Sequence, residues 1–354
     1  MHYATRARFK WTALEQGMGN DMLGAVLGIE STAHTFSMGM VNSEGVPTPS
    51  VSSMLQPKEG GIHPREAADH HADISKKVLE ELLSKEELKI SAVAFSQGPG
   101  LAPCLRVGAS VARSIATTLD VPLIGVNHCV AHIEIGREQC NCDDPVLLYV
   151  SGGNTQVICK VGDRYRVLGE TLDVGIGNML DKFARINGMA FPGGPKIEKL
   201  AAEWLEKNPN PSMEGLELPY AVHGMDLQFS GLYTAAKHMV EKGTELGAVC
   251  WSLQEHAFAA SVEVAERALA HTGKTEVLLG GGVACNTRLR KMVSRMAEDR
   301  GCSAHVPDRM FCVDNGSMIA RLGWLHLREK EHTTLENSAV NPQLRTDQTV
   351  ITWA

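Results

Sequence analysis

The sequence predicts an α/β protein of two lobes, each a mixed sheet flanked by helices, with a ligand cleft between the lobes. The chain has 354 residues, more than the roughly 150 residues typical of one domain. A strand–turn–strand pattern opens near residue 23 and returns at residue 146, each time followed by alternating strand and helix patterns. We therefore expect a non-core extension at 1–21, an N-terminal lobe at 22–145 and a C-terminal lobe with helical insertions at 146–354.

The first half opens with a strand pattern from Leu23 that is apolar on both faces, as in a buried strand. The turn residues 42–45 separate an alternating segment at 37–41 from a second one around Val46, which predicts an antiparallel pair. Pro64 suits the first turn of a helix that follows. The remaining elements expected in this half are a strand at 92–96, a helix at 105–118 and a strand at 122–126.

The second half repeats this order from Val146. The strand V-L-L-Y-V leads through the turn S-G-G-N-T into a return strand, and a third strand is expected at 165–170. The stretch 208–226 is rich in proline and glycine, which predicts irregular structure. Helices are expected at 179–186, 196–206, 248–271 and 317–327, and a strand at 276–279.

The composition excludes several classes of protein. A hydrophobic content of 44% with 21% charged residues excludes extended disorder. A net charge of −7 disfavours a general coat for nucleic acid or a membrane surface. No apolar run approaches the roughly 20 residues that span a bilayer, and residues 1–21 lack the apolar core of a secretory signal. Nine cysteines without a C-x-x-C pair fit the reduced thiols of a cytoplasmic protein.

A histidine pair follows the strand expected at 122–126. His128 and His132 are spaced to lie on one face of a helix, where two imidazoles can bind one divalent metal ion. The alternative is a pair of surface or capping histidines, but sites in α/β proteins gather at strand ends. A zinc protease helix carries Glu directly after the first histidine. Cys129 occupies that position here, so metalloprotease chemistry is disfavoured.

Two glycine-rich turns predict contact with a nucleotide. In S-G-G-N-T, consecutive glycines let backbone N–H groups approach phosphate oxygens, although a plain hairpin turn has the same residues. Glycines 280–282 end a strand and precede a helix, a turn that admits a flat ring or a phosphate. Neither a G-x-G-x-x-G fingerprint nor a P-loop occurs, so those nucleotide folds do not apply.

Further polar residues lie at expected strand and helix ends. Asp314 precedes the helix expected at 317–327 and suits either a helix cap or a metal ligand. The acid Glu30, with Ser31, Thr32 and His34, lies straight after the first strand and suits a phosphate or metal-bound water, with a local turn as the alternative. The histidines at 63, 70 and 71 are interpreted as a solvated helix face.

Together, the two hairpins and the late G-G-G turn resemble an actin-like ATPase fold of the hexokinase and heat-shock type. More narrowly, the sequence is similar to the universal tRNA N6-adenosine threonylcarbamoyltransferase family, in its archaeal and eukaryotic branch. The similarity covers about residues 23–353 in family order. The matching stretches are G-I-E-S-T-A-H-T, H-P-R-E-A-A-D-H-H, Q-G-P-G-L-A-P-C-L-R-V-G, N-H-C-V-A-H-I, Y-V-S-G-G-N-T-Q-V, G-N-M-L-D-K-F-A-R, P-G-G-P-K-I-E, F-S-G-L, G-G-G-V-A-C-N and N-P-Q-L-R-T-D.

This resemblance implies transfer of a threonylcarbamoyl group from threonylcarbamoyl-AMP to N6 of the adenine 3′ to the anticodon. The tRNAs would be those that read codons starting with A, and AMP would leave. The implied cofactor is one divalent metal ion, iron or zinc. An adenylate is the expected nucleotide, with ATP and Mg²⁺ as the alternative.

The resemblance also implies site residues. The metal ligands would be His128, His132 and Asp314, with Tyr149 as a weaker or alternate ligand. The phosphate would be held at Ser151, Gly152 and Gly153, the ribose at Asp181, Gly194 and Glu198, and the adenine side at Asn286. Tyr149 and Val150 are further implied residues of the substrate and nucleotide site. Ser31, Thr32 and His34 stay candidates for a phosphate loop. No residue is identified as the catalytic base that removes the proton from N6.

Members of this branch work with a small dimerising subunit and an atypical protein kinase subunit of the KEOPS complex, so both are implied partners, and tRNA is the implied substrate. We expect no membrane partner. The helix that carries His63 and His71 is our expectation for part of the docking surface. The sequence contains no H-R-D or D-F-G motif, so kinase activity of this chain is not expected. The competing functions are a small-molecule kinase or ATPase on the same fold and a nucleotide-binding scaffold.

Overall fold

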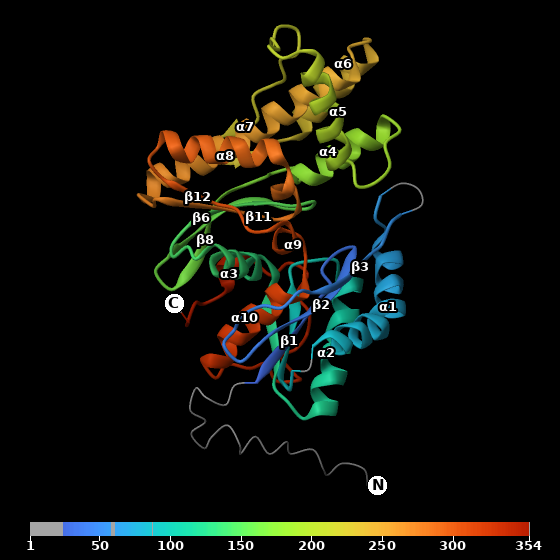
Figure 1. The fold of residues 1–354 in the computed structure, drawn as a ribbon, viewed down its shortest axis with the longest axis vertical. Helices are drawn as coiled ribbons and strands as arrows, with labels where there is room; N and C mark the ends of the chain where they lie inside the picture. Colours follow the sequence, from blue (N-terminus) through green and yellow to red (C-terminus); the bar gives the residue numbers. More distant parts are fainter. Residues whose placement is uncertain (1–23, 58–60, 87, 354) are drawn as a thin grey trace.

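The computed structural model describes residues 24–57, 61–86 and 88–353, and contains two five-stranded mixed sheets, one in each half of the chain (Figure 1). The first sheet has the order β3-β2-β1-β4-β5 and the second the order β12-β11-β6-β7-β8. The strands of the first sheet are β1 (Ala25–Glu30), β2 (Thr35–Val41), β3 (Val51–Met54), β4 (Ile90–Gly98) and β5 (Leu123–Asn127). Those of the second are β6 (Val146–Val150), β7 (Thr155–Val161), β8 (Arg164–Glu170), β11 (Glu276–Gly280) and β12 (Ser303–His305).

The two sheets share one topology. In the first sheet, β1 pairs antiparallel with β2 and parallel with β4. In the second, β6 pairs antiparallel with β7 and parallel with β11. Each half therefore begins with an antiparallel meander and continues with two parallel strands, so the duplication predicted from the sequence is present in the structure.

Helices cover both faces of the first sheet. Residues at alternate positions of β1 pack in opposite directions, because successive side chains of a strand point to opposite faces. Leu27 packs in the cluster that contains Val78 of α1 (Pro64–Lys85) and Ala109 of α2 (Ala102–Leu119). Val26 packs in the cluster that contains Met318 of α10 (Gly316–Arg328). The last long helix of the chain thus returns to the sheet built by its first residues.

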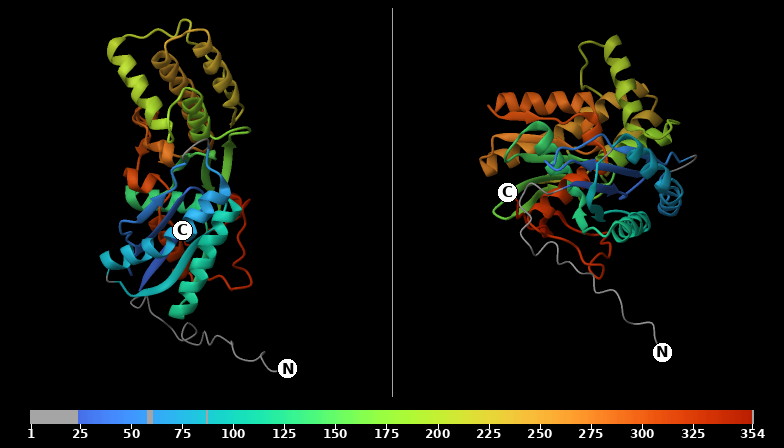
Figure 2. Two further views of the ribbon diagram at one scale, coloured as in Figure 1. Left: turned by 90° about the vertical axis from the view of Figure 1, so that its right-hand side faces the viewer. Right: turned by 60° about the horizontal axis from the view of Figure 1, so that its bottom comes forward.

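A larger group of helices lies on the outer face of the second sheet, at the end of the molecule away from the first sheet (Figures 1 and 2). The longest, α7, has sixteen buried residues and forms the centre of the core of this half. The helices of the group are α4 (Ile176–Ile186), α5 (Gly194–Lys207), α6 (Ser230–Glu241), α7 (Leu246–Thr272) and α8 (Thr287–Asp299).

Shorter elements complete the fold. The helix α3 (His128–Cys140) lies between the two sheets, close to β11 and α10 (Figure 1). A two-stranded sheet interrupts the irregular stretch before α6. The elements are β9 (Val222–His223), β10 (Asp226–Leu227), α9 (Arg309–Cys312) and the 3₁₀ helices η2 (Gly282–Cys285) and η3 (Thr346–Gln348).

Three local predictions differ from the structure. The return strand expected around Val46 begins at Val51, because Pro47 and Pro49 cannot donate to a strand ladder. The helix α6 was not predicted. His71, expected on a solvated helix face, is fully buried in α1 against Phe36, with their ring centroids 5.4 Å apart. The expected extension at 1–21 lies outside the described residues, among which no helix is long and apolar enough to cross a bilayer.

Candidate functional site: a metal centre beside a nucleotide cleft

The strand β5 and the helix α3 position the histidine pair. Asn127 ends β5, and its side-chain oxygen caps α3 by accepting from the backbone N–H groups of Cys129 and Val130 at 2.9 and 3.2 Å. The cap fixes the start of the helix at His128. His132 then follows one turn later on the same face, as the spacing predicts.

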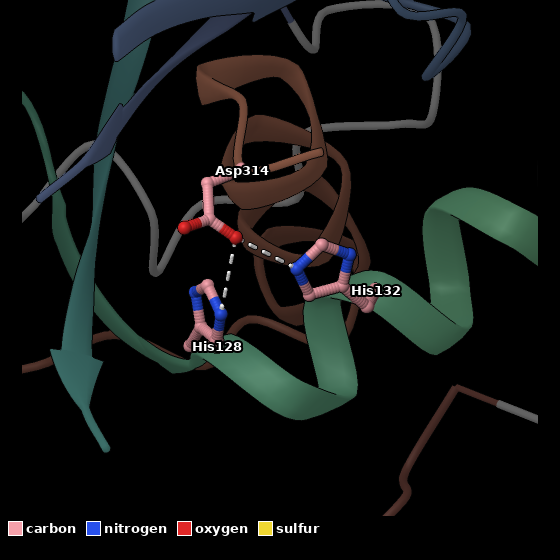
Figure 3. A group of neighbouring side chains, drawn as sticks. All are labelled: His128, His132 and Asp314. Atoms are coloured by element: carbon pink, nitrogen blue, oxygen red, sulfur yellow. Dashed lines mark hydrogen bonds and ion pairs between the residues drawn. The ribbon is translucent and has the colours of Figure 1, made fainter. Parts of the chain in front are cut away.

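The loop between α9 and α10 brings Asp314 to the histidines (Figure 3). Asn315 provides the cap of α10 by accepting from the N–H of Met318 at 2.9 Å, so the Asp314 carboxylate does not serve as that cap. Its Oδ1 atom lies 3.2 Å from Nε2 of His132 and 3.6 Å from Nε2 of His128. Three potential metal ligands from two distant segments therefore converge, with their donor atoms within 4.8 Å of one another.

The three potential metal ligands differ in their protonation. Burial opposes protonation of His128, but the carboxylates of Glu30 and Asp314 outweigh it and raise the pKa of His128 to about 9. Burial lowers the pKa of His132, and the hydrogen bond to Asp314 offsets this only in part. Burial also opposes ionisation of Asp314, yet the two histidines hold its pKa well below the usual value. At neutral pH the Asp314 carboxylate and the His128 imidazole are therefore both charged, whereas His132 is neutral.

Glu30 fixes the orientation of His128. Its carboxylate is fully buried at the end of β1, where Oε2 lies 2.9 Å from Nδ1 of His128. Its other oxygen accepts from the N–H of Thr32 at 2.6 Å. Because a carboxylate on Nδ1 turns Nε2 outward, this contact has the arrangement that commonly supports a histidine metal ligand.

Tyr149, at the end of β6, completes one wall of the group. Its hydroxyl lies 3.2 Å from Nε2 of His128, and its ring centroid is 5.0 Å from that of His132. Burial raises the pKa of Tyr149 well above the usual value, so the phenol is neutral. Two imidazole nitrogens and one carboxylate oxygen, with this hydroxyl beside them, suit iron or zinc and leave coordination positions for substrate. The side chains present fit a divalent metal.

The S-G-G-N-T turn lies against the start of α4. The N–H of Gly177 donates to the carbonyl of Ser151 at 3.1 Å, and that of Asn178 to the carbonyl of Gly152 at 3.0 Å. A Cβ at Gly177 would lie 2.8 Å from Cα of Gly152, so only glycine permits this approach. The first N–H groups of α4 are therefore used in binding the turn, and the helix dipole favours a negative charge beside it.

Asp181 lies one turn further along α4, where it contacts the loop before α5. Its Oδ1 accepts from the N–H of Gly193 at 2.7 Å. Burial raises the pKa of Asp181, and the amides of Gly193 and Gly194 act in the opposite direction. A carboxylate held in this way faces the cleft with one fixed orientation, as a ribose hydroxyl ligand requires.

One cavity of about 930 Å³ joins these groups, and both halves of the chain line it. This volume is at the upper end of the range typical of small-molecule sites. Across it, His34 of the β1–β2 turn contacts Phe191 of the second half edge-on, with ring centroids 5.4 Å apart. The residues expected from the sequence that line the cavity are Thr32, His34, His128, Tyr149, Ser151, Gly152, Gly153, Asp181 and Asp314.

Other expected residues lie behind or beside this cavity. Ser31, His132 and Val150 are buried behind its wall. Asn286 caps α8 by accepting from Arg288 at 2.9 Å, and it donates to Gln254 at 2.8 Å. Glu198 accepts from the N–H of Thr287 at 2.8 Å, while Gly194 donates to Asp181.

Sequence reasoning missed several residues of the site. Glu30 was expected only as an acid of the turn after the first strand, and its contact with a histidine far along the chain is one that no local pattern reveals. Lys182 and Arg185 supply the cationic side chains of α4 that line the cavity. They lie within the quoted stretch G-N-M-L-D-K-F-A-R, at the i, i+3 spacing that places both on one helix face.

Comparison with known proteins identifies the family. The model of the tRNA N6-adenosine threonylcarbamoyltransferase family matches residues 49–321, most of the chain. The chain belongs to this family. It is 52% identical over 334 residues to a protein of that name from Methanococcoides burtonii, covering 93% of this chain and 97% of the relative. A second similar protein, from Methanocella arvoryzae, is also 52% identical, over 93% of this chain and 98% of the relative. The resemblance found in the sequence is therefore confirmed, and the family is one of transferases.

Another relative is longer. A "Probable bifunctional tRNA threonylcarbamoyladenosine biosynthesis protein" from Methanosarcina acetivorans is 52% identical over 93% of this chain. The chain spans 59% of the length of that relative. The relative from Methanosarcina acetivorans therefore contains a further portion that does not align with this chain.

Solved structures support the predicted fold class. The crystal structure of HypF from T. kodakarensis matches 86% of this chain and 48% of its own, with a TM-score of 0.61 and 17% identity. An activator of 2-hydroxyisocaproyl-CoA dehydratase from Clostridium difficile matches 86% of this chain and 96% of its own, with a TM-score of 0.52 and 12% identity. At these identities the likeness is one of fold. With the duplicated sheets, it confirms the actin-like architecture.

Proposed function

We propose that this chain transfers the threonylcarbamoyl group from threonylcarbamoyl-AMP to N6 of the adenine 3′ to the anticodon, in tRNAs that read codons starting with A. The observation that carries the proposal is that His128 and Asp314, which converge with the buried His132, line the same cleft as the S-G-G-N-T turn. In threonylcarbamoyl-AMP, the phosphate and the carbonyl carbon of the transferred group are joined through one oxygen atom. The cleft offers an anion-binding turn and a candidate metal centre side by side, which matches that substrate.

Different residues of the chain bind the different parts of the substrate and the metal. The turn at Ser151–Gly153 holds the phosphate by its backbone N–H groups, and the dipole of α4 favours the negative charge there. Asp181 binds the ribose hydroxyls, and Gly194, Glu198 and Asn286 complete the adenosine side. His128, His132 and Asp314 hold the metal, with Tyr149 beside them. Glu30 keeps His128 directed at the metal position.

When bound, iron or zinc at this centre acts as a Lewis acid on the carbonyl of the transferred group. The glycine turn and Asp181 then orient the adenylate so that its carbonyl lies at the metal side of the cleft. AMP is the leaving group, and its phosphate stays paired with the turn as the acyl bond breaks. His34 and Phe191 meet across the cavity and restrict the entry of water from that side.

We propose that the chain works as the catalytic subunit of a multi-subunit complex of the KEOPS type. Its net charge of −7 supports this view, because tRNA binding relies on cationic side chains that partner subunits would supply. A small dimerising subunit and an atypical protein kinase are the expected partners. The Methanosarcina acetivorans relative, named bifunctional, supports a second activity in the same assembly.

A transfer assay tests the proposal. The protein, the partner subunits, threonylcarbamoyl-AMP and an unmodified tRNA specific for an A-starting codon are combined, and mass spectrometry of the digested nucleosides detects the product. We expect threonylcarbamoyladenosine with the unchanged protein and none with the His128→Ala/His132→Ala variant. The exposed His223 provides a matched control, and His223→Ala keeps full activity.

One result would overturn the proposal in favour of another enzyme. If the unchanged protein forms no modified adenosine but hydrolyses ATP steadily, the function is that of a small-molecule kinase or ATPase on this fold. If it does neither and still assembles with its partners, it is a nucleotide-binding scaffold.

A further inference from the structure

Two cationic side chains of α4 line the cleft and have no role in the binding of the adenylate. Lys182 and Arg185 are exposed and lie three positions apart, which places both on one face of the helix. Nζ of Lys182 lies 4.3 Å from the centre of the Tyr233 ring, a contact that holds the ammonium group without neutralising it. Among the described residues, neither cation forms an ion pair with a carboxylate. Both charges are therefore available to an anion that enters the cleft.

The guanidinium of Arg185 reaches the first half of the chain. Its Nη1 atom lies 3.2 Å from the position that a Cβ of Gly61 would take. The next residue, Ile62, lines the cavity together with Leu101, and both side chains pack against one small apolar cluster between α1 and α2. An apolar wall therefore lies beside a cation. This combination suits a nucleotide of RNA, whose base has apolar faces and whose backbone is anionic.

The proposed transfer requires a second substrate in the same cavity. N6 of the acceptor adenine must reach the carbonyl of the bound adenylate, so the acceptor nucleotide has to enter the cavity of about 930 Å³. The glycine turn, Asp181 and the metal ligands are assigned to the adenylate and the metal. The cations of α4 and the apolar wall are left for the acceptor. Partner subunits can bind distant parts of the RNA, whereas a nucleotide in this cavity lies among side chains of this chain.

We propose that Lys182 and Arg185 bind backbone phosphates next to the acceptor adenosine, whose base lies against the apolar wall of Ile62 and Leu101. This inference rests on the proposed function and names the residues that position its RNA substrate. The ammonium group of Lys182 acts as a point charge, and the planar guanidinium of Arg185 can hold two phosphate oxygens at once. Because both side chains belong to one helix face, they contact one short stretch of the RNA strand.

Steady-state transfer kinetics with the assembled complex test the proposal. The variant Lys182→Gln/Arg185→Gln removes both charges and keeps polar side chains. We expect KM for the tRNA to rise by about tenfold or more, because phosphate contacts are lost. The kcat at saturating tRNA and KM for threonylcarbamoyl-AMP should stay within about twofold of the unchanged protein, because the adenylate site is intact. Lys182→Arg/Arg185→Lys keeps both charges and should restore KM for the tRNA.

The matched control removes two cations from outside the cavity. Lys207 of α5 and Arg295 of α8 are exposed and do not belong to the residues that line the cleft. Lys207→Gln/Arg295→Gln therefore changes the net charge equally and should leave KM for the tRNA as it is. Calorimetric titration with AMP adds a measurement that needs no transfer, and the AMP affinity of both double variants should equal that of the unchanged protein.

Salt dependence separates a loss of charge contacts from a change in packing. The logarithm of kcat/KM for the tRNA falls linearly with the logarithm of the salt concentration, because each phosphate contact releases counterions. Loss of two contacts to a single strand makes this slope shallower by about 1.4. The control variant keeps the slope of the unchanged protein. A helix that is merely distorted by the substitutions would lower kcat/KM without a change of slope.

The two substrates decide between the two anions that the reaction brings into the cleft. A rise in KM for threonylcarbamoyl-AMP, with KM for the tRNA unchanged, would show that the cations bind the carboxylate of the threonyl group, and the proposal would be wrong. Normal transfer with unchanged KM values or an unchanged salt slope contradicts the assignment of Lys182 and Arg185 alone. If the unchanged protein transfers nothing, the proposed function fails and this assignment fails with it.

Discussion

The Oδ1 atom of Asp314 lies 3.2 Å from Nε2 of His132, although the two residues are 182 positions apart in the chain. His132 belongs to α3, which follows the first sheet, and Asp314 precedes α10, which packs back onto that sheet. The return of α10 therefore assembles the candidate metal centre. Its carboxylate ligand comes from a segment that follows the second sheet in the sequence.

Replacement of His132 tests the centre directly. His132→Ala removes one imidazole ligand, so the metal content after dialysis falls by about tenfold or more. Elemental analysis of the protein expressed with iron or zinc measures the content. His223→Ala, which removes an exposed histidine, is expected to bind the ion as the unchanged protein does. Equal metal content in the two variants would remove His132 from the ligand set.

Glu30 is predicted to act through His128. In Glu30→Gln, one of the two carboxylate oxygens that contact Nδ1 of His128 and the N–H of Thr32 becomes an amide NH₂ group. The imidazole loses its fixed orientation, and the affinity for zinc falls by about 10- to 100-fold. Competition with a chelator measures this affinity. The exposed Glu44 supplies the control, since Glu44→Gln changes the same chemistry far from the centre.

Replacement of Asp181 is predicted to weaken nucleotide binding without changing metal binding. Asp181→Asn removes the charge that faces the cleft while it keeps one oxygen for the N–H of Gly193. Loss of a hydrogen bond to a charged group weakens binding of the adenylate by about tenfold or more. Calorimetric titration with AMP gives the affinity, and elemental analysis should find the metal content unchanged. The exposed Asp163 gives the control variant Asp163→Asn. An AMP affinity equal to that of the control contradicts the assignment.

The sequence predicts those parts of the fold whose signal lies in a short stretch of residues. The runs at β1 and β6 are apolar on both faces and predict buried strands, and the repeat of the hairpin order predicts two similar sheets. The helix α10 was also expected, but its amphipathic pattern does not say which sheet it covers. The contact of Glu30 with His128 has no sequence signal either, because it depends on how β1 and α3 lie in space.

Short or polar elements were harder to predict. The helix α6 begins with Ser-Gly and has only two buried residues, so its apolar pattern is weak. Burial of His71 follows from the packing of α1 against β2, since the sequence around it is polar. The convergence of Asp314 with the histidines entered through family resemblance alone, because no spacing rule connects positions so far apart.

The close approach of α4 to the S-G-G-N-T turn depends on Gly177. In Gly177→Ala, the new methyl group would lie 2.8 Å from both Cα of Gly152 and the carbonyl oxygen of Ser151. The helix must shift, which lowers the free energy of unfolding by about 1 to 3 kcal/mol and weakens AMP binding. Urea unfolding and calorimetry measure the two effects. Gly231 in α6 has no neighbouring heavy atom in the way of a Cβ, so Gly231→Ala is the tolerated control.

His71 links stability to pH. Burial, with the neighbouring His70 and His34, lowers the pKa of His71 to about 4 from its ordinary value of 6.5, although the backbone of Ala33 acts in the opposite direction. Between these two values the unfolded chain binds a proton that the folded chain does not. The contribution to stability is therefore complete above pH 6.5 and is lost as the pH falls toward 4, by about 2 kcal/mol between pH 7 and pH 5.

The variant His71→Gln removes this titration. Its free energy of unfolding should fall less than that of the unchanged protein when urea unfolding is repeated at pH 7 and at pH 5, with a difference of about 2 kcal/mol. His223→Gln is the control, because an exposed histidine has similar surroundings in the folded and unfolded chain. If His71→Gln loses as much stability on acidification as this control, another group causes the acid sensitivity. The buried ring against Phe36 would then be a packing element without a role in pH dependence.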